Sequence, residues 1–329
     1  MRCSAWLASI GAALLLSQVV PTIAQAQSGT IRFIVGTVAG GAIDPYARLI
    51  AEHMSKTLGQ PIIIDNRPGA NGNLSAQFIA DSPADGALIW IGTQAFTEIN
   101  PNAFANQRWS IDDFTPLIRG VEAPLVFVAH PGVPANSFEE FLNWAKANRG
   151  KLSYASYQPG TPSHFLGYQL NEKFNLDLTH VPYRGSGLQA TALIAGHSQF
   201  GFAQLNAAAP QHAAGKLKAF AITSAQRWPA MADVPTFAEL GRPEFTARVW
   251  FGLLVKKGTP EAIVNRYIEA AKAAHNDPEV RKKLEVQGFE VSGATGSAQL
   301  LANIKEQIAR WGKLVKASGF SAEDRGSTR

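Results

Sequence analysis

The sequence predicts an α/β fold made of two similar units, and three observations lead to this prediction. Apolar strands alternate with amphipathic helices, which is the pattern of mostly parallel sheets. A strand, a loop of small residues and a helix follow one another twice, about 120 residues apart, beginning at Ile31 and at Leu152. The chain of 329 residues is long enough for roughly two domains.

The first 26 residues have the features of a cleavable secretory signal. Arg2 gives a positive start, the run from Ala5 to Val20 is apolar, and Ala24-Gln25-Ala26 fits the A-x-A cleavage rule. A retained membrane anchor is the alternative, but the apolar run is short for a span and the cleavage motif follows it directly. We therefore expect export, with a mature chain that begins near Gln27.

Composition argues against several classes of function. The only cysteine is Cys3, inside the signal, so the mature chain has no thiol, disulfide or cysteine metal site. The seven histidines lack metal-ligand spacing, and neither a metal nor another cofactor is expected. The formal net charge is +5, and removal of Arg2 leaves +4. Without a dense Lys/Arg run, this charge indicates a solvated basic surface rather than nucleic-acid binding.

In the first unit, each element follows from a local pattern. Strand 31–35 is apolar and runs into the small-residue loop 36–42, and helix 45–58 carries apolar residues at helical spacing. Asp44 precedes Pro45 and is expected to cap that helix. Further strands are predicted at 61–64, 87–91 and 124–129, and further helices at 73–80 and 138–148.

The second unit repeats this order. Strand 152–155 leads into the loop 156–163 and then into a helix at 164–173. Thr259 and Pro260 signal another helix start, with Thr259 as the cap. The remaining strands are predicted at 178–181, 200–203, 218–222 and 249–255, and the remaining helices before 195, after 260, at 278–287 and at 297–316, followed by a polar tail at 317–329 that is expected to fray.

Both small-residue loops stand between a strand and a helix, which is a design for holding an anion. Glycine lets the backbone approach a ligand, and a helix N-terminus offers free N–H groups and a partial positive charge. Open α/β sheets place ligands at the carboxyl ends of their strands, so the two loops are expected to face each other across a cleft. A purely structural turn is the alternative for each loop.

Candidate ligand-binding residues lie on these loops and after three other strands, and no catalytic residue is predicted. Asp44 can instead serve only as a helix cap, His164 can pack on its own loop, and Arg184 can face solvent. Trp250 and Phe251 are expected in the core between the units rather than in a ligand wall. The candidates are Val38, Ala39, Gly40, Gly41, Ala42, Asp44, Thr93, Gln94, Ser156, Gly160, Thr161, Ser163, His164, Arg184, Gln204 and Asn206.

Longer motifs run through the whole mature chain. They are AGGAIDPYAR (39–48), LGQPIIIDNRPGANGN (58–73), PADGALIWIG (83–92), HVPYRG (180–185), ITSAQRWPAMADVPTFAELG (222–241), W-F-G (250–252) and KKGTP (256–260). With these motifs in this order, the chain resembles the Bug family of periplasmic solute receptors, the binding subunits of tripartite tricarboxylate transporters.

The resemblance implies a type II-like periplasmic binding protein with two lobes, each a mainly parallel sheet flanked by helices. Lobe 1 would comprise 27–122 plus 248–329 and lobe 2 would comprise 123–247, with crossover strands near 121–126 and 245–250 as the hinge. Backbone amides and small polar side chains of the two facing loops would grip a ligand carboxylate. The receptor would be a periplasmic monomer that delivers its cargo to the membrane permease subunits of the transporter.

Two departures from the family pattern fall where selectivity should be set. The first loop usually begins with proline and an aromatic residue, but here it reads Gly36-Thr37-Val38. The second is usually richer in glycine, but here Tyr157-Gln158-Pro159 intervenes. Candidate cargoes are tricarboxylates, dicarboxylates, aromatic acids such as benzene dicarboxylates, nicotinate-like acids and acidic amino acids. The departures favour an aromatic or otherwise bulky acid.

Two other classes of function compete with transport. An enzyme needs an activated nucleophile beside a base, and the sequence contains no G-x-S-x-G, no H-E-x-x-H and no Walker A loop. We therefore expect no enzymatic activity. A receptor that presents its closed lobes to a membrane sensor kinase is compatible with the same sequence.

Overall fold

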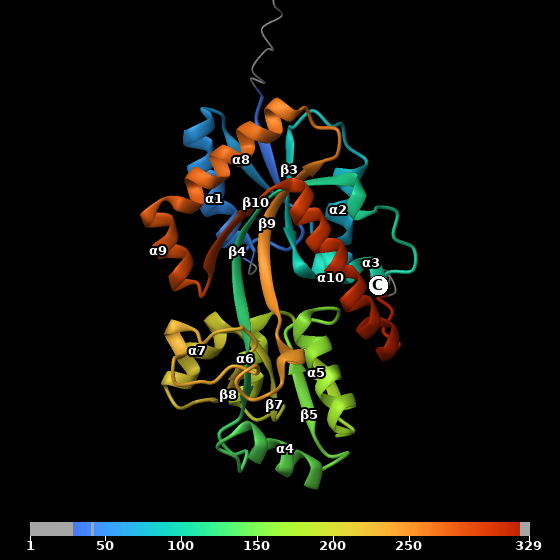
Figure 1. Ribbon diagram of the computed structural model, residues 1–329, viewed down its shortest axis with the longest axis vertical. Helices are drawn as coiled ribbons and strands as arrows, with labels where there is room; N and C mark the ends of the chain where they lie inside the picture. The colour runs from blue at the N-terminus through green and yellow to red at the C-terminus, as the bar shows by residue number, and fades with distance from the viewer. Residues whose placement is uncertain (1–28, 41–42, 323–329) are drawn as a thin grey trace, which may run out of the picture.

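The structure, a computed structural model, describes residues 29–40 and 43–322 (Figure 1). The predicted signal, residues 1–26, and the loop residues Gly41 and Ala42 lie outside the described residues. Two lobes stand one above the other, each with a sheet covered by helices (Figure 1). No helix in the described part of the chain has the length and apolarity needed to cross a membrane.

Lobe 1 is built on a mixed sheet in the order β2-β1-β3-β9-β4, with β10 on the other edge of β4. β1 pairs in parallel with β2 and β3, whereas β9 runs antiparallel to β3 and β4. Its strands are β1 (Ile31–Val35), β2 (Ile62–Asn66), β3 (Leu88–Thr93), β4 (Phe114–Ala129), β9 (Arg248–Lys256) and β10 (Glu290–Thr295), and its helices are α1 (Asp44–Leu58), α2 (Asn73–Ala80), α3 (Asn100–Ala103), α8 (Glu261–Asn276), α9 (Pro278–Val286) and α10 (Ser297–Ser318).

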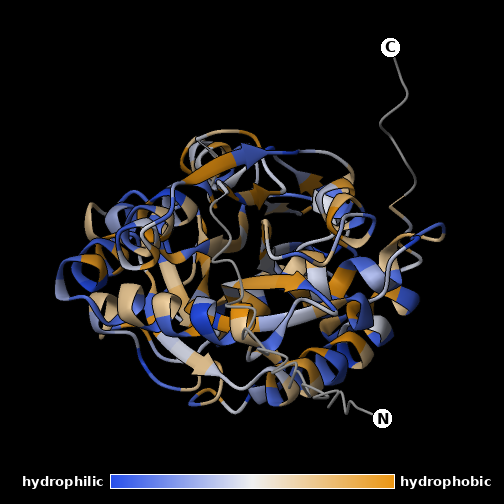
Figure 2. Cartoon of the chain, turned by 90° about the horizontal axis from the view of Figure 1, so that it is seen from above, coloured by the Kyte–Doolittle hydropathy of each residue, from blue (hydrophilic) through white to orange (hydrophobic). Residues whose placement is uncertain are grey.

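Lobe 2 contains the sheet β4-β7-β5-β6, in which β8 also pairs with β4. β5 is parallel to β6 and β7, and β4 is antiparallel to β7 and β8. Its remaining elements are α4 (Phe138–Ala147), β5 (Ser153–Ser156), α5 (Pro162–Phe174), β6 (Thr179–Pro182), α6 (Ser186–Ile194), β7 (Phe200–Gln204), α7 (Leu205–Ala213) and β8 (Lys218–Ile222). Hydrophobic residues are frequent on the strands in the interior, and the helices around them alternate hydrophobic and hydrophilic residues (Figure 2).

One strand, β4, belongs to both sheets. It pairs with β9 up to Pro124, opposite Arg248, and from Leu125 onward it pairs with β7 and β8. The exchange of partners falls inside the first predicted crossover, and β9 begins inside the second. The exact lobe limits, after residues 122 and 247, stay a prediction.

The two-lobed α/β prediction is confirmed, and, apart from the start of β4, the helices and strands recognised from local patterns recur with their ends shifted by at most two residues. The sequence reading missed β10, α7, α3 and the first half of β4. It also missed a π-helical turn at Ala95–Ile99 and short 3-10 turns at Ala70–Gly72 and Ile111–Asp113.

Three local predictions need correction. Thr259 does not cap α8, because Pro260 is its N-cap and the Thr259 hydroxyl donates to the Lys256 carbonyl instead. Of the tail at 317–329 that is expected to fray, the first two residues end α10 and Phe320 packs against lobe 2 with its ring centroid 5.1 Å from that of His164, while residues 323–329 lie outside the described residues. The cap role of Asp44 is treated with the site below.

Phe127 lies at the centre of the lobe 2 core. Its ring packs within 6.2 Å, centroid to centroid, of six other phenylalanine rings, on β7, β8, α4 and the segment after β8. Phe127 itself is on the half of β4 that joins this sheet and is fully buried. Such a cluster contributes through buried area and through tilted or edge-on ring contacts.

A buried carboxyl group, Glu98, lies behind the strands that join the lobes. Its Oε1 accepts a hydrogen bond of 2.8 Å from the indole of Trp250, on β9, and the Arg119 guanidinium is 4.0 Å away. Glu98 is 1 % exposed. Burial raises the pKa of Glu98 to about 7, against the opposing effect of the Trp250 hydrogen bond and the Arg119 charge.

We expect Phe127→Ala to lower the free energy of unfolding by about 3–5 kcal/mol, because it removes ring contacts and leaves a cavity that its neighbours cannot fill. Urea unfolding of the mature chain measures this loss. Phe127→Leu, which keeps most of the volume, should lose clearly less. If the alanine variant loses less than about 1 kcal/mol, Phe127 is not central to the stability of the lobe 2 core.

Glu98 gives a pH-dependent prediction. Its pKa is higher in the folded than in the unfolded chain, so the folded state keeps a proton that the unfolded state releases, and this group costs stability as pH rises from about 4.5 to about 7. Glu98→Gln removes this cost. The stability of the Glu98→Gln variant relative to the parent should therefore increase by on the order of 3 kcal/mol between pH 4.5 and pH 8. Melting curves at both pH values test this, and an offset independent of pH would refute it.

Candidate functional site

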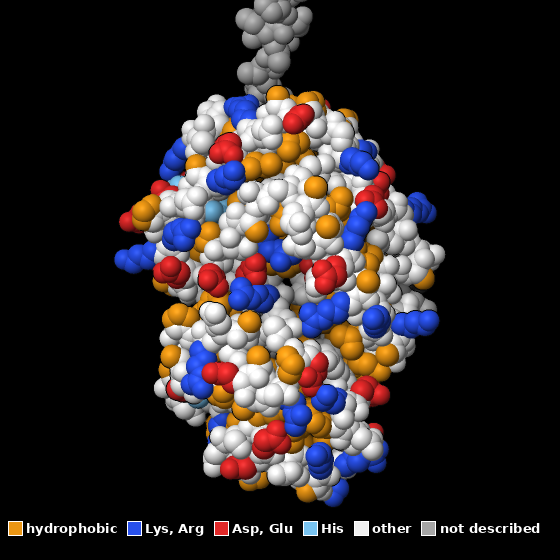
Figure 3. Space-filling view, in the orientation of Figure 1, with side chains coloured by type: hydrophobic (Ala, Val, Ile, Leu, Met, Phe, Trp, Pro, Cys, Tyr) orange, Lys and Arg blue, Asp and Glu red, His pale blue; other side chains and the backbone are white. Residues whose placement is uncertain are grey.

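A cavity of about 560 Å³ lies between the two lobes. The carboxyl ends of β1, β2 and β3 reach it from lobe 1, and those of β5, β6 and β7 reach it from lobe 2. The strand β9 closes one wall with Val249, Trp250 and Phe251. The predicted cleft at the strand ends is therefore present, and the surface view shows acidic and basic side chains on the rim where the lobes meet (Figure 3).

Lobe 1 contributes two loops to the cavity. The first provides Gly36, Thr37 and Val38, after β1. The second, residues 68–72, joins β2 to α2 and contains four consecutive positive φ angles: Gly69 at 137°, Ala70 at 45°, Asn71 at 50° and Gly72 at 81°. Left-handed backbone at two residues that are not glycine is costly and tends to occur at ligand clamps.

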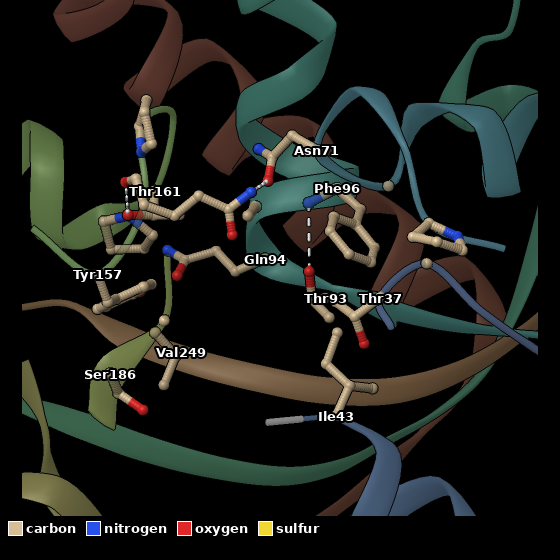
Figure 4. Close-up of a pocket in the computed structure, with 18 of the residues that line it drawn as sticks. Thr37, Ile43, Asn71, Thr93, Gln94, Phe96, Tyr157, Thr161, Ser186 and Val249 are labelled. Carbon is tan, nitrogen blue, oxygen red and sulfur yellow. Dashed lines mark hydrogen bonds between the residues drawn. The ribbon is translucent and has the colours of Figure 1, made fainter. Parts of the chain in front are cut away.

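Close packing explains why small residues are needed here. A methyl group at Gly72 would come within 2.5 Å of the Phe96 ring, and one at Gly36 would come within 2.8 Å of Phe96 and of the Ser75 hydroxyl. Phe96 therefore lies under both loops and lines the cavity between them (Figure 4). The glycines fix the approach of the backbone to this ring.

Thr93 and Gln94 reach the cavity at the end of β3. The Thr93 hydroxyl accepts a hydrogen bond of 3.3 Å from the Phe96 amide and so helps to start the π-helical turn. Gln94 is 4 % exposed and its side chain extends across the cavity toward Tyr157 (Figure 4). Its Oε1 has no hydrogen-bond partner among the described residues. A buried amide without a partner at a cavity wall is suited to a polar ligand atom.

Lobe 2 contributes the loop after β5 and the start of α6. Tyr157, Gln158, Pro159 and Thr161 line the cavity, and the Thr161 hydroxyl donates to the Gln158 carbonyl at 2.6 Å. Arg184, Gly185 and Ser186 line it where α6 begins, and Arg184 is also exposed to solvent. Gly185 is the N-cap and no side chain caps this end, so the first amides of α6 stay available beside the Arg184 charge.

Hydrogen bonds join the lobes at the edge of the cavity. Gln158 Nε2 donates to Asn71 Oδ1 at 2.8 Å, and Asn71 Nδ2 donates to the Gly160 carbonyl at 3.4 Å and to Asn100 Oδ1 at 3.0 Å (Figure 4). Asn71 is thus fixed within lobe 1 and contacts lobe 2. We call Asn71 and Gln158 the interlobe amide pair.

The predicted candidates divide into three groups. Six of them line the cavity, and their contact with a ligand stays a prediction: Val38, Thr93, Gln94, Thr161, Arg184 and Gln204. Gly41 and Ala42 lie outside the described residues. The structure places the others outside the lining: Ala39, Gly40, Asp44, Ser156, Gly160, Ser163, His164 and Asn206.

Asp44 is a support residue rather than the N-cap of α1. The N-cap is Ile43, and Asp44 is the first helical residue. Its carboxylate accepts the Gly40 amide at 3.1 Å and bonds to Arg48 and Asn66. Burial acts to raise the pKa of Asp44, but these hydrogen bonds hold it below the usual range. The Gly40 amide is therefore already satisfied within the loop.

The polar candidates of the second loop support its backbone from behind. Ser163 Oγ donates to the Phe202 carbonyl at 2.5 Å, and the Ser156 hydroxyl lies 2.7 Å from His180 Nε2. The His164 ring stacks on His180 with centroids 4.1 Å apart. Burial lowers the pKa of His164 to about 3 and that of His180 to about 4, so both rings are neutral near pH 7.

Other placements differ from the sequence-based expectation as well. Asn206 is exposed at the start of α7, and Gly160 is turned toward Asn71 and Phe320. Trp250 and Phe251 are buried between the lobes, as expected, and they also line the cavity.

Sequence reasoning missed the loop after β2 as part of the site. The signal was present in its Pro-Gly-Ala-Asn-Gly composition, because two glycines around an asparagine favour left-handed backbone. The described residues contain no group of three His, Cys, Asp or Glu side chains that could hold a metal ion.

Comparison with known proteins places the chain in a family. Residues 46–320 match the model of the tripartite tricarboxylate transporter family receptor, TctC. The chain is 30 % identical over 298 residues to the protein BugT of Bordetella pertussis, covering 88 % of this chain and 89 % of that one. These matches extend through both lobes.

Solved structures agree with this placement. A protein of R. palustris solved with adipate is 30 % identical, covers 89 % of this chain and 98 % of its own, and superposes with a TM-score of 0.79. MatC from Rhodopseudomonas palustris, solved with bound malate, is 32 % identical, covers 87 % of this chain and 98 % of its own, and has a TM-score of 0.77. The periplasmic binding protein BugD is 29 % identical, covers 89 % of this chain and 98 % of its own, and has a TM-score of 0.77. The chain belongs to the Bug family of periplasmic solute receptors of tripartite tricarboxylate transporters.

Proposed function

We propose that this protein is an exported receptor that binds a small organic carboxylate between its lobes and delivers it, as a monomer, to the membrane permease of a tripartite transporter. The observation that carries the proposal is the cavity at the carboxyl ends of six strands, with Arg184 and the uncapped start of α6 on its wall. Free amides at a helix start are suited to a carboxylate, and the exposed Arg184 beside them adds a positive charge.

The site is suited to binding and releasing a ligand rather than to catalysing a reaction. Its lining contains no histidine, no acidic side chain and no cysteine among the described residues, so it offers no general base beside a nucleophile. A ligand that contacts both lobes favours the closed arrangement by its difference in affinity for the closed and open states. The hinge is the pair of strands β4 and β9.

Thermal denaturation of the mature chain with a panel of organic acids tests the proposal. A ligand that binds only the folded state at 100 times its Kd adds about 2.7 kcal/mol of stability, which raises the melting temperature by several degrees. The matched control is the primary amide of each acid, which keeps the shape and lacks the charge. Stabilisation by no acid, or equally by acids and amides, would contradict a carboxylate receptor.

The interlobe amide pair should contribute to closure. We expect Asn71→Gly, which relieves the left-handed strain and removes the hydrogen bonds, to weaken ligand binding about fivefold, and Gln158→Ala to do the same, because each change removes about 1 kcal/mol from the closed arrangement.

Calorimetric titration of the two single variants and the double variant separates this role from simple damage. If the two residues act through one contact, the double variant loses no more affinity than either single variant. Additive losses would show that they act independently.

A further inference from the structure

We infer that the cavity takes up its carboxylate together with a proton, and that Glu98, a buried carboxyl group behind the cavity wall, is the residue that receives this proton. The inference rests on the proposed function, because it describes how charge changes when a carboxylate binds at the same site. It gives Glu98 a role in ligand affinity that needs no direct contact with the ligand.

Glu98 lies directly behind the wall of the cavity. It belongs to the π-helical turn Ala95–Ile99, and two residues of this turn, Ala95 and Phe96, line the cavity. Trp250, on β9, lines the cavity as well, and its indole Nε1 donates a hydrogen bond of 2.8 Å to Glu98 Oε1. The Trp250 ring is therefore shared between the cavity and the buried carboxyl group.

One cation stands beside Glu98. The Arg119 guanidinium, on β4, is 4.0 Å from Glu98 Oε1 and lies over the Trp250 ring, 5.1 Å from its centroid. At this distance the two groups form no direct hydrogen bond, so the guanidinium offsets only part of the cost of burying an ionised carboxylate. Glu98 is 1 % exposed, and water cannot offset the remainder.

The other charged groups on the joining strands pair with one another. Glu122, on β4, is 4.0 Å from Arg119 and 3.1 Å from Arg248, on β9. Arg248 is in turn 3.7 Å from Glu290, on β10. These two arginines and two glutamates carry no net charge together. Ionisation of Glu98 therefore makes the whole group negative by one unit, and protonation leaves it neutral.

The remaining elements packed on the turn that carries Glu98 add no charge near it. α10 contributes the buried Trp311 indole, and the charged side chains of this helix are all exposed. β3, α3 and the turn Ala70–Gly72 contain no charged side chain. Among the described residues, the cavity lining itself contains no carboxyl group and no histidine. Glu98 is thus the carboxyl group that acts on a ligand through the Trp250 wall.

A bound carboxylate favours the protonated form of Glu98. Backbone amides and small polar side chains hold a carboxylate without bringing a full positive charge, so the ligand charge still acts on groups behind the wall. Like charges repel, and at a separation of roughly 10 Å with an effective dielectric constant of about 20 the repulsion changes the affinity on the order of tenfold. Protonation of Glu98 removes this repulsion.

The exchange falls near neutral pH. Burial raises the pKa of Glu98 to about 7, against the Trp250 hydrogen bond and the Arg119 charge. A carboxylate in the cavity raises this pKa further, so the ligated protein keeps a proton that the free protein releases. Affinity is therefore full below about pH 7 and is lost as pH rises through the pKa of the ligated protein. Burial lowers the pKa of His164 to about 3 and that of His180 to about 4, so these two rings do not titrate in this range.

Calorimetric titration of the mature chain at pH 7 in HEPES and in Tris tests the inference, because the two buffers have different ionisation enthalpies and a proton taken up from them changes the measured heat. The probes are adipate, malate and the acid that most raises the melting temperature. We expect uptake of about 0.4 proton per ligand, and an affinity on the order of tenfold weaker at pH 9 than at pH 6. Equal heats in both buffers, with an affinity independent of pH, overturn the inference and leave the carboxylate receptor standing. Binding of no acid overturns both.

Glu98→Gln tests the assignment to this residue. The amide oxygen can still accept the Trp250 indole N–H, but the side chain cannot ionise, so proton uptake and the pH dependence of affinity should both disappear. The affinity at pH 6 should stay within about twofold of the parent, because the amide resembles the protonated acid. Glu122→Gln is the matched control, since it removes a carboxylate beside the same Arg119 and leaves Glu98 in place, and its proton uptake should persist. Uptake that persists in Glu98→Gln, or is lost equally in both variants, would refute the assignment.

Discussion

The way the two lobes are joined depends on one strand, β4, which belongs to both sheets. β4 pairs with β9 as far as Pro124 and with β7 and β8 from Leu125, so no flexible linker separates the lobes along this path. The pairing is tight, because a methyl group at Gly252 would come within 2.3 Å of the Ile118 carbonyl. With the strand directions fixed in this way, the carboxyl ends of both sheets face one cavity.

Local sequence patterns predicted most of the elements but only part of the site. The strands at 31–35 and 218–222 and the helix at 73–80 have the predicted bounds, since apolar periodicity and glycine or proline signals are local. The first half of β4 was missed because Pro116 and Gly120 interrupt its apolar pattern. The packing of Phe320 on lobe 2 was missed for a different reason, because contact between distant segments leaves no local signal.

The site shows the same division between local and long-range information. Glycine-rich loops next to helix starts pointed to the correct cleft, but not to the side chains that face its interior. Asp44, Ser163 and His164 are polar and sit in or beside the expected loops, yet Asp44 and His164 accept the loop amides of Gly40 and Gly160, and Ser163 donates to the Phe202 carbonyl on β7. Residues that line the cavity through sheet geometry, such as Phe96 and Val249, look like ordinary core residues in the sequence. When a cavity wall is apolar, its residues are of the same types as core residues, so the sequence cannot distinguish the two.

The central place of β9 has a consequence for the order in which the protein can be assembled during its synthesis. This strand lies between β3 and β4 in the sheet but comes after all the strands of lobe 2 in the chain. A nascent chain that ends before Lys256 therefore has two unpaired strand edges where lobe 1 should be continuous. The sheet of lobe 2 is complete by Ile222, much earlier. Lobe 1, which begins the described chain, is thus the last to close, and only a chain that already includes β9 can form the cavity.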